Sequence, residues 1–404
     1  MNFTDKHILI LTSTNLACNP RCLKELRLMV DMKISVTVVA FNLHNWSTER
    51  EKELNNELPG INFQYLEGSR KNFFPWLLSS IFEKTGRILI PFFSSNLSLY
   101  ALAVSKRSWL LLSWCKSSTA KPDLIIAHNA AAFYPAYWLA KKNKIPFALD
   151  IEDYHPGETI PATVKKGVSI LMKNLIEKST YASYGSPLIM QYCEKLLGVS
   201  NPCSFVINNF FPGSNFKDVV PVITEKIQLV WFSQNIDKGR GLEELLSVFV
   251  FFDDVFELTL IGNPIESFCS KEIEDKKGIS IINSVHPTVL NKMIGQFDIG
   301  LAIEPGKDLN NTIALSNKIL TYFQSGLFIL ASDTLAQQLF MQHHPGHGIC
   351  SSLKKESLTH SFERLVKDKE QIRALRSKRF KNAAAFNWEN ESAVLKEKWE
   401  AIFQ

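Results

Sequence analysis

The sequence predicts an α/β protein of two domains, each with a parallel sheet covered by helices on both faces. Short apolar runs alternate with helical segments along most of the chain, which is typical of such sheets. A polar break after residue 212 separates two alternating series, and a length of 404 residues exceeds one ordinary core. We therefore expect domains at 1–214 and 215–404.

The first half begins as strand, helix, strand. The apolar run His7–Leu11 predicts the first strand, Pro20–Asp31 a helix, and Ile34–Phe41 the second strand. Three later apolar runs predict further strands, with helices between them, at Leu124–Ala127, Phe147–Ile151 and Phe205–Ile207. Strands that alternate with helices in this way form a parallel sheet.

The second half repeats the alternation after a linker. Pro212, Gly213, Ser214 and the polar residues to about Glu225 interrupt the pattern. Five strands are then expected, at Ile227–Phe232, Leu258–Ile261, Ile279–Ile282, Phe297–Ile303 and Leu327–Ala331.

The last two of these strands flank a short helix. Leu315, Ile319 and Tyr322 recur at helical spacing, and Gly326 ends the helix. The helix opens with Ser316-Asn317-Lys318, whose unpaired amides and positive dipole end would face the crevice beyond the strand ends. Such a place suits a phosphate or diphosphate. The alternative is that these polar residues only cap the helix.

Composition narrows the class of protein. Hydrophobic residues make up 46% and charged residues 21%, which indicates a globular chain. The net charge of +5 is small for this length and does not favour a nucleic-acid partner. Seven cysteines form no CxxC pair, as is typical of reduced thiols in the cytoplasm. We interpret the start, MNFTDKHILILTST, as a first strand, because its apolar run is short for a signal peptide.

The basic segment from Arg70 to Lys116 breaks the alternation. It contains the apolar stretches FFPWLL, ILIPFF and WLLLSWC, and Glu83 is its only acidic residue. No stretch reaches the roughly 18 residues needed to span a bilayer. Two interpretations stay open: two amphipathic core helices with solvated basic faces, or a surface for anionic lipid and a lipid-linked acceptor.

Four segments together resemble a known family. FDIGLAIEPGKDLNNTIALSNKILTYFQSGLFILASDT resembles the nucleotide-sugar site of GT-B glycosyltransferases near family 4, of the bacterial surface-polysaccharide type. LVWFSQNIDKGRGLEELL resembles the start of that half, and DLIIAHNAAAFYPAYWLAKKNKIPFALDIED the middle of the first half. FNWENESAVLKEKWEAIF resembles the family's last helix. The resemblance implies two Rossmann-like domains facing each other across a cleft, with about 386–404 crossing back onto the first.

This resemblance implies that 1–214 binds the acceptor and 215–404 the nucleotide sugar. The donor leaves as a nucleoside diphosphate, so the site must stabilise negative charge on phosphate. Lys238 and Arg240 flank a glycine between a strand and a helix, and Lys318 lies on the later helix. Two cations and a helix dipole can offset a diphosphate, so we expect no metal and no cofactor. Asp150-Ile151-Glu152, the nearest Asp-x-Asp element, is the alternative metal site.

The resemblance also implies an acidic pair near the donor's ribose or base. The corresponding positions hold Thr321 and, near the other, Ile313. We expect Glu304, at the end of the preceding strand, to take over a ribose contact. This departure leaves a catalytically weak homologue as an alternative.

In the first half, polar residues follow the strand ends. His128 stands where the family places a histidine against the donor sugar, and Arg21 where relatives contact acceptor or phosphate. The loop from Asp150 is rich in titratable groups and is expected to bind the acceptor, through Glu152, Asp153, His155 and Glu158. Of these residues we expect His128 and Asp153, with Lys238, to be catalytic. The alternatives are a structural histidine and a solvated turn.

The sequence therefore predicts a glycosyltransferase of the hexosyl type. As implied by the resemblance, it would move a sugar, with retention, from a nucleotide-sugar donor to a lipid-linked or saccharide acceptor in cell-surface polysaccharide synthesis. We expect it in the cytoplasm or peripheral on the inner face of the cytoplasmic membrane, where an anionic surface would be a partner. A nucleotide-sugar epimerase or phosphorylase on the same fold and a non-catalytic nucleotide-sugar-binding homologue are the alternatives.

Overall fold

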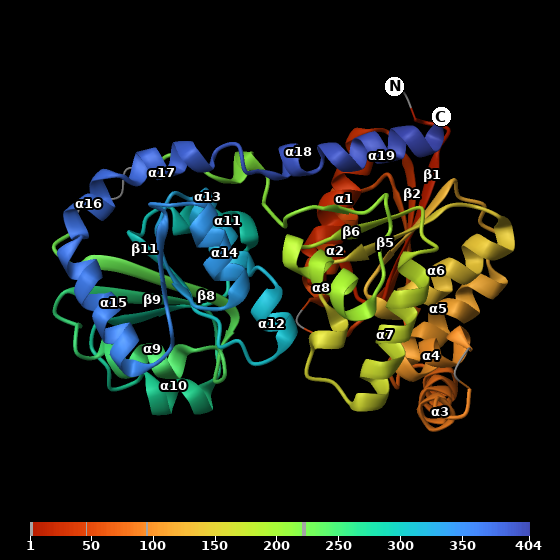
Figure 1. Ribbon diagram of the computed structural model, residues 1–404, viewed down its shortest axis with the longest axis horizontal. Helices are drawn as coiled ribbons and strands as arrows, with labels where there is room; N and C mark the ends of the chain where they lie inside the picture. Colours follow the sequence, from red (N-terminus) through yellow and green to blue (C-terminus); the bar gives the residue numbers. More distant parts are fainter. Residues whose placement is uncertain (1–2, 46, 94–95, 220–223) are drawn as a thin grey trace. The chain divides into compact units, whose positions relative to one another are not determined.

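A computed structural model describes residues 3–45, 47–93, 96–219 and 224–404. The chain forms two compact units, Met1–Asn208 with Ser392–Gln404 and Asn209–Glu391. Each unit has one sheet, whose described strand pairs are parallel, with helices on both faces (Figure 1). The predicted fold class is confirmed. Residues 220–223 of the expected linker and 94–95 of the basic segment lie outside the described residues.

The sheet of the first unit has the order β3-β2-β1-β4-β5-β6-β7. Its strands are β1 His7–Thr12, β2 Ser35–Asn42, β3 Ile61–Glu67, β4 Leu124–His128, β5 Phe147–Ile151, β6 Tyr181–Tyr184 and β7 Phe205–Val206. Strands are added on one side of β1 and then, from β4 onward, on the other. Such a switch point is where open α/β sheets place their ligand sites.

Helices of the first unit connect these strands. They are α1 Pro20–Asp31, α2 Thr48–Glu57, α3 Phe73–Leu89, α4 Leu97–Val104, α5 Lys106–Ser117, α6 Ala130–Asn143, α7 Ala162–Ile176, α8 Pro187–Leu197 and, from the chain's end, α19 Ala393–Phe403. Three-residue 3-10 helices stand at Leu16–Cys18 and His155–Gly157. Helix α1 begins where Asn19 caps the Cys22 amide at 3.0 Å and proline takes the first position.

The last helix, α19, belongs to the first unit. Trp399 is fully buried, and its indole N–H donates to the Tyr181 hydroxyl at 2.9 Å. The rings of Phe3 and Phe403 lie 5.7 Å apart, so the described start and the end of the chain also meet.

The basic segment forms three helices, α3, α4 and α5, and not the two of the first interpretation. Short polar residues divide it: the Asn96 side chain accepts from the amides of Ser98 and Leu99 at the start of α4. The Ser105 side chain caps α5 in the same way. Within the described ranges, no helix is long and apolar enough to cross a membrane.

The sheet of the second unit has the order β10-β9-β8-β11-β12-β13. Its strands are β8 Ile227–Ile236, β9 Phe256–Pro264, β10 Ile279–Ile282, β11 Ile299–Ala302, β12 Phe328–Ser332 and β13 Gly348–Ser351. The switch point of this sheet lies between β8 and β11.

Helices cover both faces of the second sheet. They are α9 Leu242–Phe249, α10 Glu266–Glu272, α11 Pro287–Ile294, α12 Leu309–Ile313, α13 Asn317–Gln324, α14 Leu335–His343, α15 Lys355–Lys367, α16 Lys369–Ala374, α17 Arg376–Ala383 and α18 Trp388–Glu391, with a 3-10 helix at Gly213–Asn215. One hydrophobic cluster contains Trp231 and Phe362, and the other contains Tyr322 and Phe340.

Helix α13 ends as the sequence predicts. The Leu327 amide donates to the Tyr322 carbonyl and the Gly326 amide to the Phe323 carbonyl, both at 3.0 Å. This is a Schellman motif, which requires the positive φ of +71° that Gly326 has. The motif turns the chain directly into β12.

Candidate functional site

The loop between β8 and α9 brings two cations to the switch point of the second sheet. Lys238 is exposed there, and the Arg240 guanidinium donates to the Ser233 hydroxyl at 2.8 Å. Gly241 has φ +78°, and a Cβ at this position would lie 2.4 Å from a methyl carbon of Ile303. Only glycine therefore lets the loop fold back over the end of β11.

The end of β11 and the first turn of α13 carry an ion pair. Lys318 Nζ donates to Glu304 Oε1 at 2.7 Å, and the two side chains are 11% and 15% exposed. The ammonium also lies 5.6 Å from the centre of the Trp231 ring, within cation–π range. The Ser332 hydroxyl, at the end of β12, accepts from the Glu304 amide at 2.9 Å. These contacts join β8 to the ends of β11 and β12.

Two helices begin at this edge without a side-chain cap. Ser316 stands at the N-cap of α13 and Thr334 at that of α14, yet neither side chain bonds to its helix. Both hydroxyl oxygens are buried and have no hydrogen-bond partner among the described residues. Capping is therefore not what the Ser316 side chain does. A buried polar atom left without a partner costs about 1–3 kcal/mol, which a bound anion or water would offset.

The positions of the family's acidic pair are closed to a ligand. Ile313 is fully buried, and Thr321 is 1% exposed and donates to the Asn317 carbonyl at 2.9 Å. Neither side chain offers a carboxylate. Glu304 supplies one at the same edge of the sheet, and its contact with a ribose stays a prediction. Asn317, the third polar residue of the helix start, is exposed and accepts from the Asn209 side chain at 3.0 Å.

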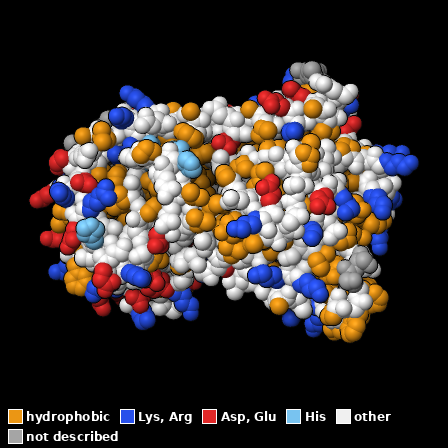
Figure 2. Space-filling view, in the orientation of Figure 1, with side chains coloured by type: hydrophobic (Ala, Val, Ile, Leu, Met, Phe, Trp, Pro, Cys, Tyr) orange, Lys and Arg blue, Asp and Glu red, His pale blue; other side chains and the backbone are white. Residues whose placement is uncertain are grey.

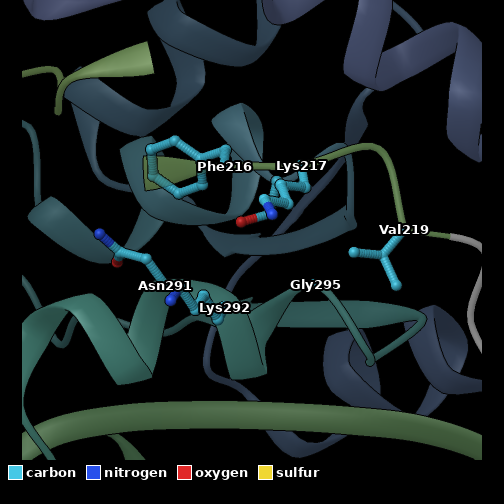
Figure 3. A pocket seen from close by; sticks show the side chains of 7 residues that line it. Phe216, Lys217, Val219, Asn291, Lys292 and Gly295 are labelled. Carbon is cyan, nitrogen blue, oxygen red and sulfur yellow. The ribbon is translucent and has the colours of Figure 1, made fainter. Parts of the chain in front are cut away.

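A cavity of about 220 Å³ lies elsewhere in the second unit (Figure 3). It is lined by Phe216, Lys217, Val219, Asn291, Lys292, Gly295 and Ser325. Gly295 precedes β11 and Ser325 precedes β12, so the cavity is at the amino edge of the sheet. The site residues that the sequence predicts in this unit lie at the opposite edge of the sheet.

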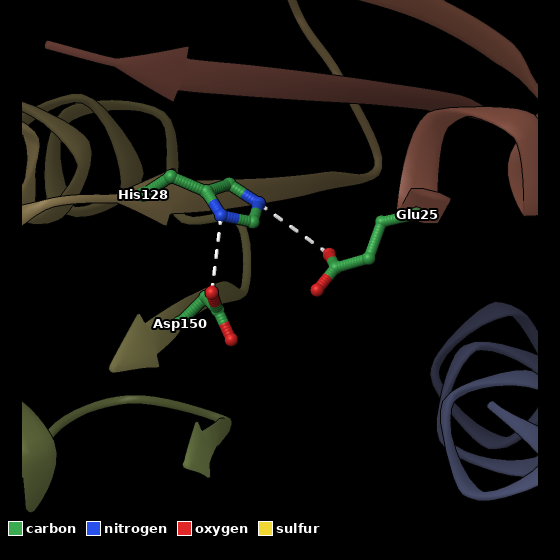
Figure 4. A group of neighbouring side chains, drawn as sticks. All are labelled: Glu25, His128 and Asp150. Carbon is green, nitrogen blue, oxygen red and sulfur yellow. Dashed lines mark ion pairs between the residues drawn. The ribbon is translucent and has the colours of Figure 1, made fainter. Parts of the chain in front are cut away.

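In the first unit, α1, β4 and β5 share a buried charge network (Figure 4). Asp150 accepts from Arg21 Nε at 2.7 and 2.9 Å and from the Ser183 hydroxyl at 2.7 Å. The His128 ring lies between two carboxylates, with Nδ1 3.2 Å from Asp150 and Nε2 3.4 Å from Glu25. All five residues are 2% exposed or less.

The protonation states of His128 and Asp150 balance the charges of this network. Burial opposes charge on the His128 ring, but Cys22, Glu25 and Asp150 outweigh it and raise the pKa of His128 well above its ordinary value. Burial likewise opposes ionisation of Asp150, but Arg21 and His128 hold the pKa of that carboxyl below its usual range. Two cations thus face two carboxylates.

Glu25, His128 and Asp150 lie close enough together to hold a metal ion. However, each ring nitrogen faces a different carboxylate, and Asp150 already accepts from Arg21 and Ser183. This arrangement fits a protonated ring better than a metal. The Asp150 carboxylate is therefore fully engaged by side chains inside the protein. The Asp150-Ile151-Glu152 element consequently lacks its first metal ligand.

His128 and Arg21 are buried, whereas side chains that bind a substrate were expected to reach the surface of a cleft. Their side chains are 1% and 0% exposed, and their polar groups face Glu25, Asp150 and the Ile207 carbonyl. The sequence locates them correctly at strand ends, but cannot show that carboxylates on other elements enclose them. Their contacts hold α1 against the sheet.

The expected acceptor loop follows β5 and keeps part of its polar surface. Asp153 and Glu158 are partly exposed, and His155 Nδ1 lies 2.6 Å from Glu158 Oε1. Burial, reinforced by Asp153, raises the pKa of Glu152 to about 7. A carboxyl that titrates near neutral pH is typical of functional sites. The roles of Asp153 and Glu158 stay predictions.

A polar cluster that was not predicted from the sequence lies at the switch point of the first sheet. Thr12 donates to the Asn129 side-chain oxygen at 3.0 Å, and Thr14 lies 3.5 Å from the same oxygen. Asn129 has a φ of +69°, which is uncommon outside glycine. Strained polar residues at a switch point are typical of ligand sites. The signal was the Thr-Ser-Thr run that begins at Thr12, the last residue of β1.

Comparisons with known proteins agree with this architecture. No protein-family model matches the sequence, and no curated protein matches it. Among solved structures, Anabaena HepE with UDP and glucose is 11% identical and covers 98% of this chain and 99% of its own, with a TM-score of 0.65. Sucrose-phosphate synthase from Thermosynechococcus elongatus is 12% identical over 98% and 99%, with a TM-score of 0.68. The fold is GT-B.

A third similar structure is an S. aureus TarM mutant in complex with fondaparinux, α-GlcNAc-glycerol and UDP. It is 12% identical and covers 99% of this GT-B chain and 100% of its own, with a TM-score of 0.64. The likeness extends over the whole of each chain.

The stability of the first unit is expected to depend on pH through His128. Its raised pKa stabilises the fold fully below the ordinary value of 6.5, and this contribution is lost as pH rises through the folded value. Asp150, with its lowered pKa, contributes above 3.8 and loses this as pH falls. The free energy of unfolding of the first unit is measured for wild type and His128→Asn between about pH 4 and 9, by urea unfolding with hydrogen exchange as the readout.

The loss of stability above pH 6.5 should be smaller in His128→Asn than in wild type. His360→Asn is the control, because that side chain is 83% exposed and should leave the profile unchanged. Parallel profiles of wild type and His128→Asn would show that folding does not raise the pKa of His128.

Proposed function

We propose that this protein is a glycosyltransferase that moves a hexosyl group from a nucleotide-sugar donor to a lipid-linked or saccharide acceptor. The observation that carries the proposal is the edge of the second sheet where α13 and α14 begin. Two buried hydroxyls without partners, those of Ser316 and Thr334, lie at uncapped helix starts, and Lys318 follows one of them. A diphosphate would satisfy these groups and the helix dipoles.

Solved structures with this fold support the choice of donor. HepE structures contain UDP and UDP-glucose, and the TarM mutant contains UDP. We therefore propose a nucleoside diphosphate as the leaving group, with UDP the first nucleotide to test.

The cations, Glu304 and the start of α13 have proposed roles at this edge. Lys238 and Arg240 pair with the diphosphate, and the Ser316 hydroxyl and the first amides of α13 donate to its oxygens. The Lys318 ammonium has three N–H donors, so it can hold Glu304 and a phosphate oxygen together. Glu304 then keeps oxygens available for a ribose hydroxyl.

Transfer is proposed to proceed with retention. As the bond between the sugar's anomeric carbon and the phosphate oxygen breaks, its electrons pass to the diphosphate, whose charge Lys238 and Arg240 stabilise. The acceptor hydroxyl attacks from the same face and gives its proton to the leaving phosphate. Asp153 and Glu158 would orient acceptor hydroxyls. The fixed cations supply the charge stabilisation for which other transferases use a metal.

The cellular setting is also a proposal. An acceptor of this class fits the synthesis of a cell-surface polysaccharide. We propose that the transfer takes place in the cytoplasm, on the inner face of the cytoplasmic membrane. We propose no cofactor and no nucleic-acid partner.

Removing either loop cation is expected to weaken nucleotide binding. Lys238→Ala and Arg240→Ala should each cost about 1.5–3 kcal/mol, roughly 10–150-fold in the UDP dissociation constant, because each loses a charge-assisted contact. Titration calorimetry with UDP, GDP and ADP measures this. Lys292→Ala is the matched control, since Lys292 lines the cavity at the other edge of the same sheet. Unchanged affinity for all three nucleotides in both loop variants would remove the loop from the donor site.

Turnover separates this function from its alternatives. Incubation with donor and no acceptor would produce an altered sugar if the protein were an epimerase. The missing acidic pair at Ile313 and Thr321 favours the binding homologue as the second candidate. Donor binding without transfer to any lipid-linked or saccharide acceptor would establish it.

A further inference from the structure

Helix α3 carries an exposed apolar stripe. Phe74, Ile81 and Ile88 are spaced two helical turns apart and are 75%, 46% and 66% exposed. Phe92, just beyond the helix, is 76% exposed. Of the fourteen large hydrophobic side chains exposed on the described residues, nine lie between residues 73 and 93, so the stripe is not scattered surface. Figure 2 shows hydrophobic side chains gathered with Lys and Arg where Figure 1 places α3.

The opposite face of α3 is fixed to the rest of the first unit. A Cβ at Gly86 would lie 3.0 Å from the Ala103 backbone nitrogen in α4, so the two helices approach closely. Arg87 donates to the Ala103 carbonyl at 3.0 Å. The Phe82 ring stacks on Trp109 of α5 at 5.4 Å. The stripe therefore cannot turn inward while these contacts hold.

The charges around the stripe select its partner. Glu83, the only acid from residue 69 to 120, is already paired with Arg87 at 2.6 Å. Arg70, Lys71 and Lys84 are exposed beside the stripe. A second copy of this chain would bring the same positive charges into contact, so self-association is disfavoured. Anionic headgroups above apolar acyl chains match both features.

We propose that α3 lies flat in the interface of an anionic bilayer with its apolar stripe toward the acyl chains, and that the acceptor is lipid-linked. The docking stands on α3 alone, whereas the acceptor class rests on the proposed function. Phe side chains at both ends of the helix insert, and the exposed Lys84 keeps α3 at the surface. The Trp76 ring, 4.9 Å from the Arg70 guanidinium and 5.6 Å from the Lys106 ammonium, suits the headgroup level.

Flotation of the full chain with vesicles tests the docking. Wild type should float with vesicles of phosphatidylglycerol and phosphatidylcholine but not with phosphatidylcholine alone, and 1 M salt should weaken binding. The triple variant Phe74→Ser/Ile88→Ser/Phe92→Ser should lose at least about tenfold in partitioning. Lys84→Ser should lose about fivefold.

The matched control exchanges equally exposed apolar side chains elsewhere. Leu196→Ser and Phe251→Ser remove side chains that are 53% and 65% exposed, and both variants should float like wild type. Thermal unfolding checks that every variant is folded; the substituted side chains lie at the surface, so their melting temperatures should match that of wild type. Equal loss in control and stripe variants would overturn the assignment of α3.

The remaining outcomes separate docking from function. Negligible or equal binding of wild type to both kinds of vesicle overturns the docking. It is also overturned if light scattering shows that wild type is a dimer and the triple variant a monomer. A protein that floats but binds none of UDP, GDP and ADP overturns the proposed function alone. With an active enzyme, the triple variant should transfer poorly to a lipid-linked acceptor in anionic vesicles and normally to a water-soluble saccharide. Equal loss on both acceptors overturns the lipid-linked assignment.

Discussion

Replacement of Arg21 by methionine is expected to destabilise the first unit by about 3–5 kcal/mol. The guanidinium donates to both oxygens of Asp150 and, at 2.6 Å, to the Ile207 carbonyl, and it is fully buried. Methionine fills most of the volume but leaves the Asp150 carboxylate inside the protein without its main counter-charge. Urea unfolding followed by hydrogen exchange in the first unit measures the loss.

Two further variants make this result specific. Arg27→Met removes an arginine from the same helix, but its ion pair with Glu57 at 3.0 Å is 46% and 41% exposed, so the cost should stay below about 1 kcal/mol. Asp150→Asn in the Arg21→Met background should recover part of the loss, because no carboxylate then lacks its arginine. Equal costs for Arg21→Met and Arg27→Met would refute a dominant role for the buried network.

Truncation of Trp399 to alanine is expected to cost about 3–5 kcal/mol, again in the first unit. The side chain is fully buried in α19 and donates to Tyr181, which lies on β6 and is also buried. Alanine leaves a cavity between the last helix and the sheet and an unpaired Tyr181 hydroxyl. Hydrogen exchange should rise in β6 and α19 but not in the second unit.

Trp399→Phe separates the two contributions. Phenylalanine keeps most of the apolar contact and loses the hydrogen bond, so about 1–2 kcal/mol is expected. An alanine variant as stable as wild type would mean that α19 contributes nothing to the core of the first unit.

Strands that are mostly aliphatic in sequence were predictable, and strands with few aliphatic residues were not. The bounds of α1, β5 and β10 coincide with those expected, because each is a clear periodic or apolar run. β3 was missed, since its residues are mostly half-buried and its sequence INFQYLE is polar at alternate positions. β6 and β13 have only four residues each, and YASY and GICS hold too little apolar character to stand out.

The candidate site was predictable only where its residues are close in sequence. The start of α13 and the loop after β8 follow from strand, glycine and helix signals within short windows. Partners brought together by the fold carry no such signal. Asp150 pairs with Arg21 across 129 positions, and this contact decides that both residues, with His128, lie inside the protein. The Ser316 side chain does not cap α13, and the spacing of residues in the sequence cannot show this.

The first unit is discontinuous in the chain, and this determines which fragments of the protein can fold alone. The second unit is an uninterrupted stretch, so two cuts in the chain would release it whole. The first unit needs residues from both sides of the second, because α19 supplies the buried Trp399 to its core. A fragment that ends at Asn208 would therefore leave the Tyr181 side chain without its cover, and a dissection of this protein should remove the second unit as an insertion.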